Sequence, residues 1–442
     1  MESVRVGLIG WGTVGCGVIR VLEENASVIR ARLGFPLELA RVADLDLETP
    51  RPVPVAREKL TQNAREILED PGIQIVVELI GGLEPARSFI LEALERGKHV
   101  VTANKALLAH HGNELFEHAE RHGGSIGFEA SVAGGIPLLK SLREGLAGNK
   151  VDTIFGILNG TGNYILTRMT EEGLAFADAL REAQEKGYAE ADPTLDVDGI
   201  DTAHKLAIAG AMAFGTPIRF DQVYVEGIRQ IDPLDVQFAT EFGYQLKLLA
   251  IGRHVNGQLE MRVHPTLIPS SHVLASVRGA YNAVHLHGNA VGSIMLYGLG
   301  AGMMPTGSAV VADIMDIARD LASGVVNRVP PLSFLPENTQ DIPIRPMEDV
   351  TTKYYFRFSA VDRPGVLSKI SGILGENAIS IAAVIQKGRE VEGAVPIVML
   401  THEAQERAVR KSLEAIDRLD IVRGPTRIIR IEDSENSHVE RE

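Results

Sequence analysis

The stretch VRVGLIGWGTVG (residues 4–15) decides the fold of the N-terminal part of the chain. Its apolar beginning predicts a strand, and the residues from Thr13 onward, TVGCGVIRVLEEN, have the spacing of a helix. Between them lies a G-x-G-x-x-G turn. Gly10 permits the tight turn, Gly12 lets the backbone approach a pyrophosphate, and Gly15 packs the helix against the strand. We therefore predict a dinucleotide site here; the alternative is a glycine-rich turn with a purely structural use.

Further strands and helices alternate after this turn, as far as residue 135. The runs predicted as strands are residues 4–10, 37–43, 73–79 and 99–103, and a helix closed by glycine spans 84–97. Strands separated by helices form βαβ units with a parallel sheet that is buried on both faces. Residues 1–135 are therefore predicted to be a Rossmann-type dinucleotide-binding domain in an α/β protein.

The rest of the chain divides into four regions by composition and pattern. Residues 136–320 are mixed and predict an α+β domain, and residues 321–350, rich in proline and polar residues, predict a connector. Residues 351–432 have the order strand, helix, strand, strand, helix, strand, which is the ferredoxin-like arrangement. The polar end, residues 433–442, is predicted to be disordered.

Bulk composition excludes several classes of function. The formal net charge is −14, from 44 basic and 58 acidic residues, which disfavours nucleic-acid binding through phosphate contacts. Cys16 is the single cysteine, so no internal disulfide forms, and a phosphorylating aldehyde dehydrogenase lacks its nucleophile. The start has no signal-peptide pattern, and no apolar run is long enough to cross a bilayer. We expect a cytoplasmic protein without membrane or nucleic-acid partners.

The end of the second predicted strand bears on the choice of coenzyme. An acid at this place normally binds the ribose hydroxyls of the adenosine, and Asp44 stands there. A carboxylate repels a 2′-phosphate and so favours NAD over NADP. Arg51 and Lys59 follow and are able to accept that phosphate, so the preference stays open with a leaning toward NAD. A simple turn cap is the alternative role for Asp44.

The segment GYAEADPTLDVDGIDTAHK (187–205) carries the chemistry of the second region. Five acids precede one base; they are Glu190, Asp192, Asp196, Asp198 and Asp201, followed by Lys205. Their spacing is not that of a calcium loop. A solvated acidic loop is one interpretation. Apolar residues at helical spacing from residue 200 to residue 214 favour a buried helix instead.

This helix is predicted to bury a lysine. Asp198 is the expected N-cap, and Asp201 and Lys205, four residues apart, share one face. The same face continues as Ile208 and Met212, so the helix is buried nearly all round. Burial lowers the pKa of a lysine toward neutrality, where it exchanges protons. Lys205 therefore fits the group that accepts the hydroxyl proton in alcohol oxidation.

The neighbouring carboxylates indicate the substrate. A group of acids around a proton-transfer lysine binds a cation, and an α-ammonium is the obvious one. The predicted substrate of the nicotinamide-dependent reaction is therefore an amino acid with a side-chain alcohol or aldehyde.

Several segments resemble homoserine dehydrogenases. The residues that carry the resemblance are AQEKGYAEADPTLDVDGIDTAHK (183–205), VTANKALLA (101–109), EASVAGGIP (129–137), NGTGNY (159–164) and GLGAGMMPT (298–306). DRPGVL (362–367) is similar to ACT domains, which bind amino acids as effectors. No kinase-like region precedes the glycine turn, as in the monofunctional form. The resemblance implies a catalytic, substrate-binding and dimerisation domain at 136–320 and an ACT regulatory domain at 351–432.

The resemblance also implies roles for single residues. Lys205 is the implied proton donor and acceptor, and Lys105 contacts the nicotinamide side and the substrate oxygen. The implied substrate set is Glu190 at the ammonium, Asp196 and Asp201 near the hydroxyl, and Thr161 near the carboxylate, with Gly160 and Tyr188. Thr13, Val14 and Gly302 line the dinucleotide. A monovalent cation, sodium in the family, takes the backbone carbonyls of Glu129, Val132, Gly134 and Ile136.

Two residues near the coenzyme have open or unusual assignments. Asn104 is either a helix cap or a nicotinamide contact. Trp11 stands where the family commonly has a smaller residue, and its side chain is expected to point away from the pyrophosphate.

The implied function is the reversible NAD(P)H-dependent reduction of L-aspartate 4-semialdehyde to L-homoserine, in threonine, methionine and isoleucine biosynthesis. Threonine is the expected effector of the ACT domain, and a homodimer or homotetramer is expected. Two alternatives are another amino-aldehyde dehydrogenase with the same lysine, and a sensor that binds dinucleotide and amino acid without turnover. Lys205 and Lys105 weigh against the sensor, which needs no proton-transfer lysine.

Overall fold

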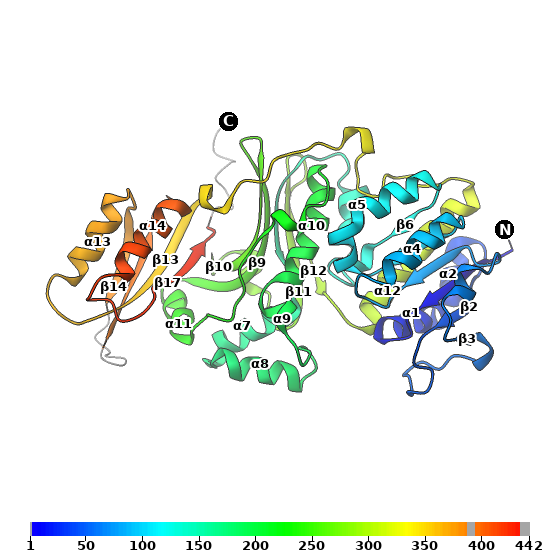
Figure 1. Ribbon diagram of the computed structural model, residues 1–442, viewed down its shortest axis with the longest axis horizontal. Coiled ribbons are helices and arrows are strands. Elements are labelled where there is room, and N and C mark those ends of the chain that lie inside the picture. The colour runs from blue at the N-terminus through cyan, green and yellow to red at the C-terminus, as the bar shows by residue number, and fades with distance from the viewer. Residues whose placement is uncertain (1, 387–393, 434–442) are drawn as a thin grey trace.

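The computed structural model describes residues 2–386 and 394–433. Figure 1 shows three units in a row along the long axis, with the N-terminal unit at one end and the C-terminal unit at the other. Of the predicted tail 433–442, all but Asp433 lies outside the described residues.

The N-terminal unit is a sheet with the strand order β3-β2-β1-β4-β5-β6. Its strands are β1 (Val4–Ile9), β2 (Leu37–Ala43), β3 (Leu60–Thr61), β4 (Ile75–Glu78), β5 (His99–Thr102) and β6 (Ile126–Gly127). The helices between them are α1 (Thr13–Glu24), α2 (Ala26–Leu33), α3 (Arg65–Leu68), α4 (Ala86–Glu95) and α5 (Lys105–Arg121). Neighbouring strands pair in parallel, and β4 and β5 are buried throughout. This is the Rossmann-type order, so the predicted fold class is confirmed.

One helix from far along the chain joins this unit. Helix α12 (Met303–Ser323) packs against α1, and two glycines permit the close approach. A Cβ on Gly17 would lie 1.9 Å from the carbonyl oxygen of Met303, and one on Gly307 would lie 2.5 Å from the carbonyl carbon of Gly17. Residues 303–323 therefore cover the N-terminal sheet, although the sequence groups most of them with region 136–320.

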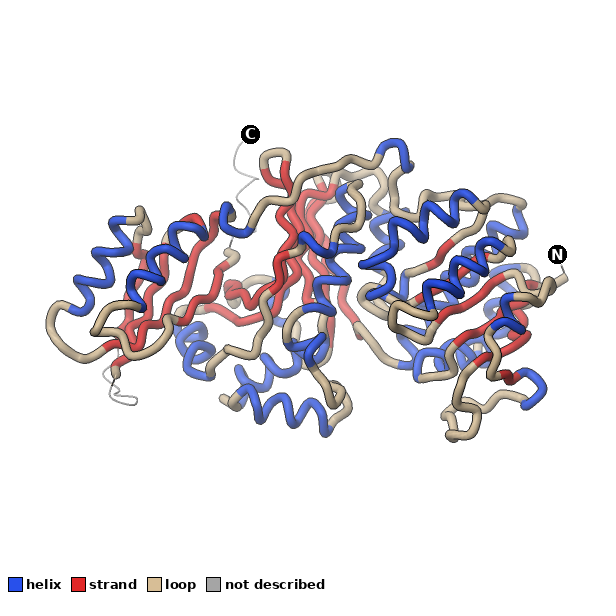
Figure 2. The backbone as a smooth tube through the Cα atoms, viewed as in Figure 1, coloured by secondary structure: helices blue, strands red, loops and turns tan. Residues whose placement is uncertain are grey.

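The middle and C-terminal units share a second sheet in the described part of the chain. Its order is β12-β11-β7-β9-β10-β17-β13-β15-β14, with β8 beside β10 and β16 beside β13. The strands of the middle unit are β7 (Val151–Ile157), β8 (Tyr224–Val225), β9 (Tyr244–Val255), β10 (Gln258–Pro269), β11 (Tyr281–Gly288) and β12 (Gly292–Leu299). Its helices are α6 (Leu138–Lys140), α7 (Gly160–Glu172), α8 (Phe176–Glu185), α9 (Thr194–Val197), α10 (Ile200–Phe214) and α11 (Pro233–Glu241). Figure 2 shows the strands running from the middle unit into the C-terminal one.

The C-terminal unit has the predicted ferredoxin-like order. Its elements are β13 (Thr351–Ala360), α13 (Val366–Glu376), β14 (Ile381–Gln386), β15 (Val395–Thr401), β16 (Ala404–Gln405), α14 (Glu406–Asp417) and β17 (Arg427–Ile431). Helices α13 and α14 lie on the same face of its strands (Figure 1). Strand β17 pairs with β13 on one side and with β10 on the other, so it joins this unit to the middle one.

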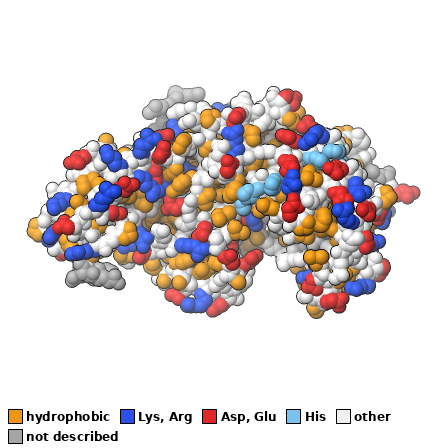
Figure 3. Space-filling view, in the orientation of Figure 1, with side chains coloured by type: hydrophobic (Ala, Val, Ile, Leu, Met, Phe, Trp, Pro, Cys, Tyr) orange, Lys and Arg blue, Asp and Glu red, His pale blue; other side chains and the backbone are white. Residues whose placement is uncertain are grey.

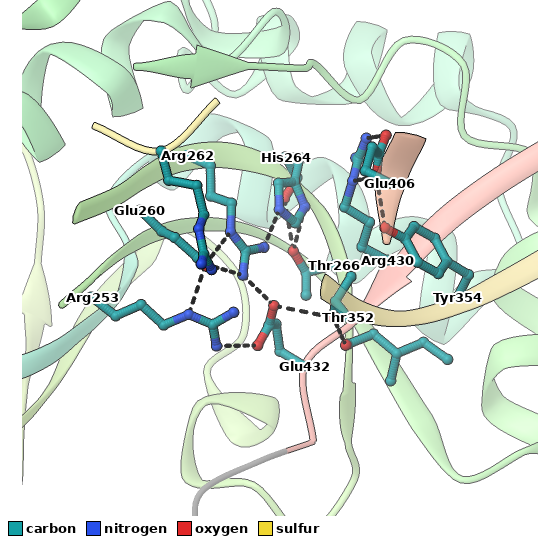
Figure 4. A network of polar contacts seen from close by, with 12 residues as sticks. Arg253, Glu260, Arg262, His264, Thr266, Thr352, Tyr354, Glu406, Arg430 and Glu432 are labelled. Carbon is teal, nitrogen blue, oxygen red and sulfur yellow. Dashed lines mark hydrogen bonds and ion pairs between the residues drawn. The ribbon is translucent and has the colours of Figure 1, made fainter. Parts of the chain in front are cut away.

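A network of buried charges holds that joint (Figure 4). Arg262 of β10 is 1% exposed, and its Nη2 lies 2.5 Å from Oε1 of Glu432, the residue after β17. Arg430 of β17 is fully buried and donates to both carboxylate oxygens of Glu406, the first residue of α14, at 2.9 and 2.6 Å. Buried ions need such partners, because an unpaired one is costly. The geometry of the joint is therefore specific.

The surface carries charges of both signs. On the face drawn in Figure 3, acidic and basic side chains are interspersed over all three units. Among the described residues, no helix is both long enough and apolar enough to cross a membrane.

Candidate active site

The glycine turn between β1 and α1 shows three different reasons for glycine. Gly10 has φ +107°, and a Cβ there would lie 2.8 Å from the carbonyl of Leu79. A Cβ on Gly15 would lie 2.2 Å from the carbonyl oxygen of Gly10, which fixes the helix close to the strand. Gly12 has no heavy atom within 4 Å of such a position, so its backbone faces open space. That opening at a helix N-terminus suits a pyrophosphate.

A cleft of about 630 Å³ lies at the carboxyl ends of the strands beside this turn. Its lining includes Gly10, Gly12, Asp44, Leu45 and Arg65. Thr13 is exposed and Val14 half-buried in the first turn of α1, next to Gly12. Gly302 has φ +127° and is the N-cap of α12, which packs against α1. The residues present therefore fit a dinucleotide.

Asp44 is tied to the glycine turn. Its Oδ2 accepts a hydrogen bond of 2.6 Å from the backbone N–H of Trp11, and its Oδ1 accepts one of 3.0 Å from Asp46 N–H. The indole of Trp11 is buried, donates from Nε1 to the carbonyl of Val53, and is stacked under Arg51, so it points away from the cleft as expected. Asp44 is thus a turn-stabilising residue that also lines the cleft.

The predicted lysine lies inside helix α10. Lys205 is 7% exposed. Its Nζ lies 2.7 Å from Oδ2 of Asp201 and 2.6 Å from the carbonyl oxygen of Leu158. Asp201 is itself buried, since α10 packs on the sheet of the middle unit. The pairing predicted from the four-residue spacing is therefore present.

A second lysine reaches the same carboxylate from the N-terminal unit. Nζ of Lys105, the first residue of α5, lies 3.0 Å from Oδ1 of Asp201. The Asn104 side chain caps α5 by accepting from Leu107 N–H, and its amide nitrogen donates to the carbonyl of Gly82. The cap uses Oδ1 of Asn104, and the bond to Gly82 uses its Nδ2. The site thus spans the boundary between the two units.

The charges of this cluster shift one another's protonation. Burial lowers the pKa of Lys205, and the nearby Lys105 ammonium lowers it further. The carboxylate of Asp201 raises the pKa of Lys105, which stays charged. Burial alone would raise the pKa of Asp201, but the two ammonium groups hold it well below the ordinary value. The arrangement therefore holds one permanently charged lysine and one that releases its proton more readily.

Asn159 is a member of the cluster that the sequence analysis missed. Its Nδ2 donates to Oδ1 of Asp196 at 2.7 Å and to Oδ2 of Asp201 at 2.9 Å. Its Oδ1 caps α7 by accepting from Gly162 N–H at 2.6 Å. Burial raises the pKa of Asp196. The asparagine before Gly160 signalled a helix cap, but no local pattern links it to acids 37 and 42 residues later.

One detail of the helix prediction is wrong. The N-cap of α10 is Gly199, with φ +82°, and no side chain caps the helix. Asp198 pairs with Arg229 instead. A glycine is needed here because the turn from α9 into α10 requires a left-handed conformation that aspartate adopts only at a cost.

The other predicted substrate residues lie at the start of α7 and in the loop before α9. The Thr161 hydroxyl donates to the carbonyl of Tyr188 at 2.6 Å, so it joins the two segments. Tyr188 and Glu190 are exposed, and Glu190 is close enough to Lys105 to raise its pKa. A Cβ on Gly160 would lie 2.7 Å from the carbonyl oxygen of Ala280, so no larger residue fits.

The predicted carbonyl site lies in a tight loop after β6. Ala133 and Gly134 both have positive φ, at 60° and 55°, and a Cβ on Gly134 would lie 2.3 Å from the carbonyl oxygen of Gly300. The carbonyl of Ile136 accepts from Leu138 N–H at 2.8 Å, and that of Glu129 accepts from Val132 N–H at 3.3 Å. Each of these carbonyl oxygens keeps a second lone pair. Oxygen lone pairs are the ligands that hard cations prefer, so the loop fits a monovalent cation.

Comparison with known proteins identifies the family. The homoserine dehydrogenase profile matches residues 137–315, and the profile of the homoserine dehydrogenase NAD-binding domain matches residues 10–129. The homoserine dehydrogenase of Pseudomonas aeruginosa is 48% identical over 436 residues, covering 98% of this chain and 99% of the relative. The chain belongs to the homoserine dehydrogenase family. It is an oxidoreductase that acts on a CH–OH group, and an ACT domain profile matches residues 354–420.

Other homoserine dehydrogenases match this chain over its full length or over most of it. The Bacillus subtilis protein is 37% identical and covers 98% of this chain and 99% of itself. The crystal structure of the Thiobacillus denitrificans protein superposes with a TM-score of 0.92 at 48% identity, covering 98% of this chain and 99% of that one. A hyperthermophilic archaeal member in complex with NADPH has a TM-score of 0.60 at 27% identity, covering 73% of this chain and 98% of that one.

Proposed function

We propose that the chain catalyses the reversible reduction of L-aspartate 4-semialdehyde to L-homoserine, with Lys205 as the proton-transfer group. A nicotinamide coenzyme held at the glycine turn, residues 10–15, would supply the hydride for the aldehyde carbon. Lys205 gives its proton to the aldehyde oxygen, which leaves a CH₂OH group and a neutral amine. In the oxidation, the neutral amine takes the proton back from the hydroxyl. The observation that carries the proposal is the cluster of the buried pair Lys205 and Asp201 with the half-exposed Lys105.

The two lysines have different proposed tasks. Lys205, with its lowered pKa, exchanges the proton. Lys105 keeps its charge and is half exposed on the N-terminal unit, and its proposed partners are the nicotinamide side and the substrate oxygen. Asp201 holds both ammonium groups in place, and it is a positioning residue as well as a neighbour of the substrate hydroxyl.

Recognition of the substrate is assigned to the segments around this cluster. Glu190 binds the ammonium, and Asp196 lies near the hydroxyl. The N-terminus of α7 at Gly160 and Thr161 meets the carboxylate with backbone N–H groups, beside Tyr188. The Thr161 hydroxyl already donates to the Tyr188 carbonyl, which supports a backbone role for this residue.

The proposed substrate is tested with two aldehydes that differ only in the α-ammonium group. Succinic semialdehyde has the same reacting group as aspartate semialdehyde but lacks the α-ammonium. Its kcat/KM for NADH or NADPH oxidation is expected to be lower by about a hundredfold or more, because Glu190 would lose the ammonium that holds the substrate in position. Product analysis should give homoserine from the amino acid. Equal rates with both aldehydes would point to another aldehyde dehydrogenase.

The preferred coenzyme is proposed to be NAD, through Asp44. Its carboxylate is fixed by Trp11 and Asp46 N–H groups at the cleft, which supports contact with ribose hydroxyls. Arg51 lies 3.9 Å from Asp44, and Arg65 lines the cleft, so both are near a 2′-phosphate. The archaeal relative in complex with NADPH indicates that the phosphorylated form can bind to a member of the family.

Asp44→Ala is expected to lower the ratio of kcat/KM for NADH to that for NADPH by about tenfold or more, since one charged hydrogen bond is worth about 1.5–3 kcal/mol. The kcat/KM for NADH is expected to fall. The kcat/KM for NADPH is expected to rise, because a carboxylate that repels the 2′-phosphate is removed. Steady-state rates with both coenzymes measure the ratio. Asp46→Asn, in the same loop, is the control. A ratio that stays the same would remove Asp44 from coenzyme selection.

The remaining assignments concern the whole protein. We propose domains at 1–135, 136–320 and 351–432, with a connector at 321–350. A sodium or similar ion is proposed to bind the backbone carbonyls of Glu129, Val132, Gly134 and Ile136. The proposed location of the protein is the cytoplasm. The pathway is threonine, methionine and isoleucine biosynthesis, with feedback by threonine through the ACT domain. A homodimer or homotetramer is supported by strand β12, whose residues alternate between half-buried and exposed positions, with Met295, Tyr297 and Leu299 exposed at a sheet edge.

A further inference from the structure

A cavity of about 470 Å³ lies at the joint between the middle unit and the C-terminal unit. The ladder between β10 and β17 has two residue pairs, Thr266–Arg430 and Leu267–Ile431, and then stops. The next residue of β10 is Pro265, which has no N–H to continue the ladder, so the two strands part there. The cavity opens between them, and both units contribute to its wall. Its lining includes Glu226, Gly227, Arg229 and Gln230 of the middle unit, and Arg410, Arg427 and Ile428 of the C-terminal unit.

The charges of the wall leave one cation without a carboxylate. Asp198 of the wall pairs with Arg229, Asp235 with Arg357, and Glu226 with Arg430. Arg427 has only a weak contact, 3.5 Å from its Nη1 to Oε1 of Gln230, and no carboxylate of the described residues lies within 4.0 Å of it. The Arg427 guanidinium is half-buried at the cavity, and its partner, Gln230, is neutral. Such a group is suited to bind a carboxylate.

The same wall has acceptors for an ammonium. Glu226 lines the cavity and is one-third exposed, and its Oε2 accepts from Arg430 Nη1 at 2.8 Å and from Tyr224 at 2.9 Å, so its Oε1 is left as a further acceptor. Gln230 also lines the cavity, and its Oε1 is an amide acceptor 3.5 Å from Arg427 Nη1. A carboxylate-binding arginine and ammonium acceptors in one small cavity fit an α-amino acid.

We propose that this joint cavity is a binding site for an α-amino acid effector within a single chain, with Arg427 at its carboxylate and Glu226 at its ammonium. The proposal rests on the proposed feedback function and assigns the place where it acts. The wall is rigid on the C-terminal side, because Arg430 is fixed by Glu406 in the buried network of Figure 4.

Contacts on the other side of the wall reach the catalytic cluster. The N–H of Ile228 donates to the carbonyl of Val197 at 2.8 Å. A Cβ on Gly227 would lie 2.4 Å from that same carbonyl oxygen and 2.5 Å from the Cα of Asp198. The segment that bears Glu226 therefore packs against the turn between α9 and α10. Helix α9 carries Asp196, and the first turn of α10 carries Asp201. An effector that draws Glu226 into the cavity shifts this turn and with it the two acids.

The test compares the effector response of the full-length wild type with that of three full-length variants. The probes are L-threonine, L-methionine and L-isoleucine, each titrated by calorimetry and as an inhibitor of NAD(P)-linked homoserine oxidation. Arg427→Gln is expected to weaken binding and inhibition by tenfold or more and to leave kcat without effector within twofold. Arg427→Lys, which keeps the charge, is expected to recover part of the response. Arg423→Gln, an exposed neighbour outside the lining, is the matched control and should respond as the wild type does.

The possible results separate this inference from the feedback proposal. Wild-type inhibition that Arg427→Gln leaves unchanged would overturn the joint site and keep the feedback. A wild-type protein that neither binds nor responds to any of the three amino acids would overturn the feedback and the joint site with it. Weakened binding in Arg427→Gln together with a wild-type response in Arg423→Gln would support the joint site.

Discussion

Lys205→Ala is expected to lower kcat for homoserine oxidation by about a thousandfold, within the range that a positioned acid or base contributes. Lys205 Nζ is buried 2.7 Å from Asp201 and 2.6 Å from the carbonyl of Leu158, and water has little access to replace it. Lys105 does not substitute for it, because its raised pKa keeps its proton bound. Steady-state kinetics in both directions measure the loss.

A binding measurement and a control variant separate a loss of catalysis from a loss of folding in Lys205→Ala. Coenzyme binding, measured by NADH fluorescence, is expected to change less than about threefold, since the dinucleotide turn lies on another unit. Lys98→Ala is the matched control: Lys98 is also buried and also donates to backbone carbonyls, of Asp70 and Ile73, but lies outside the site. It should lose stability and keep kcat. A Lys205→Ala protein with a tenth or more of the wild-type kcat would contradict the proposed mechanism.

Asp201→Asn is expected to lower kcat by about a hundredfold and to move the pH profile. The carboxylate raises the pKa of both lysines, so its loss lowers both. Oxidation needs neutral Lys205, and activity rises with pH through that pKa. The rising limb is therefore expected to move to lower pH, while the maximum falls because neither lysine is held in place. The pH dependence of kcat/KM for homoserine measures both effects.

A control for this variant comes from the same acidic segment. Asp192 is exposed and bonds to the N–H of Thr194, away from the lysines. Asp192→Asn should keep both the rate and the pH profile. If Asp201→Asn moved the limb to higher pH, or left kcat as it was, Asp201 would not be the partner that sets the charges of the site.

Local patterns predicted the parts of this protein that local forces determine. The glycine turn is visible in the sequence because three glycines fall within six residues, two of them at positions where a Cβ would clash. The pairing of Asp201 with Lys205 is visible because a helix brings residues four apart onto one face. The C-terminal order of strands and helices follows from periodicity alone, except for the short strand β16, which the pattern did not predict.

Contacts between distant segments had no such signal. Asn159, the carbonyl of Leu158 and the return of α12 onto α1 depend on how the chain folds back. The contact of Lys105 with Asp201 spans two units, and only the resemblance suggested it. Asp198 was a reasonable N-cap by residue type, but the left-handed turn at Gly199 decides where the helix begins. The joint of β10 with β17 rests on buried charges that sequence patterns assign to the surface.

The central claim is that Lys105, from the N-terminal unit, tunes the proton-transfer lysine of the middle unit. The most direct measurement is the pH profile of kcat/KM for homoserine in the wild type and in Lys105→Met. Removing the Lys105 ammonium takes away a charge that repels the Lys205 ammonium. The Asp201 carboxylate then pairs with Lys205 alone, and both changes raise the pKa of Lys205. The account predicts a rising limb displaced to higher pH by about one unit, beneath a lower maximum. A limb that stays in place or moves to lower pH would contradict it.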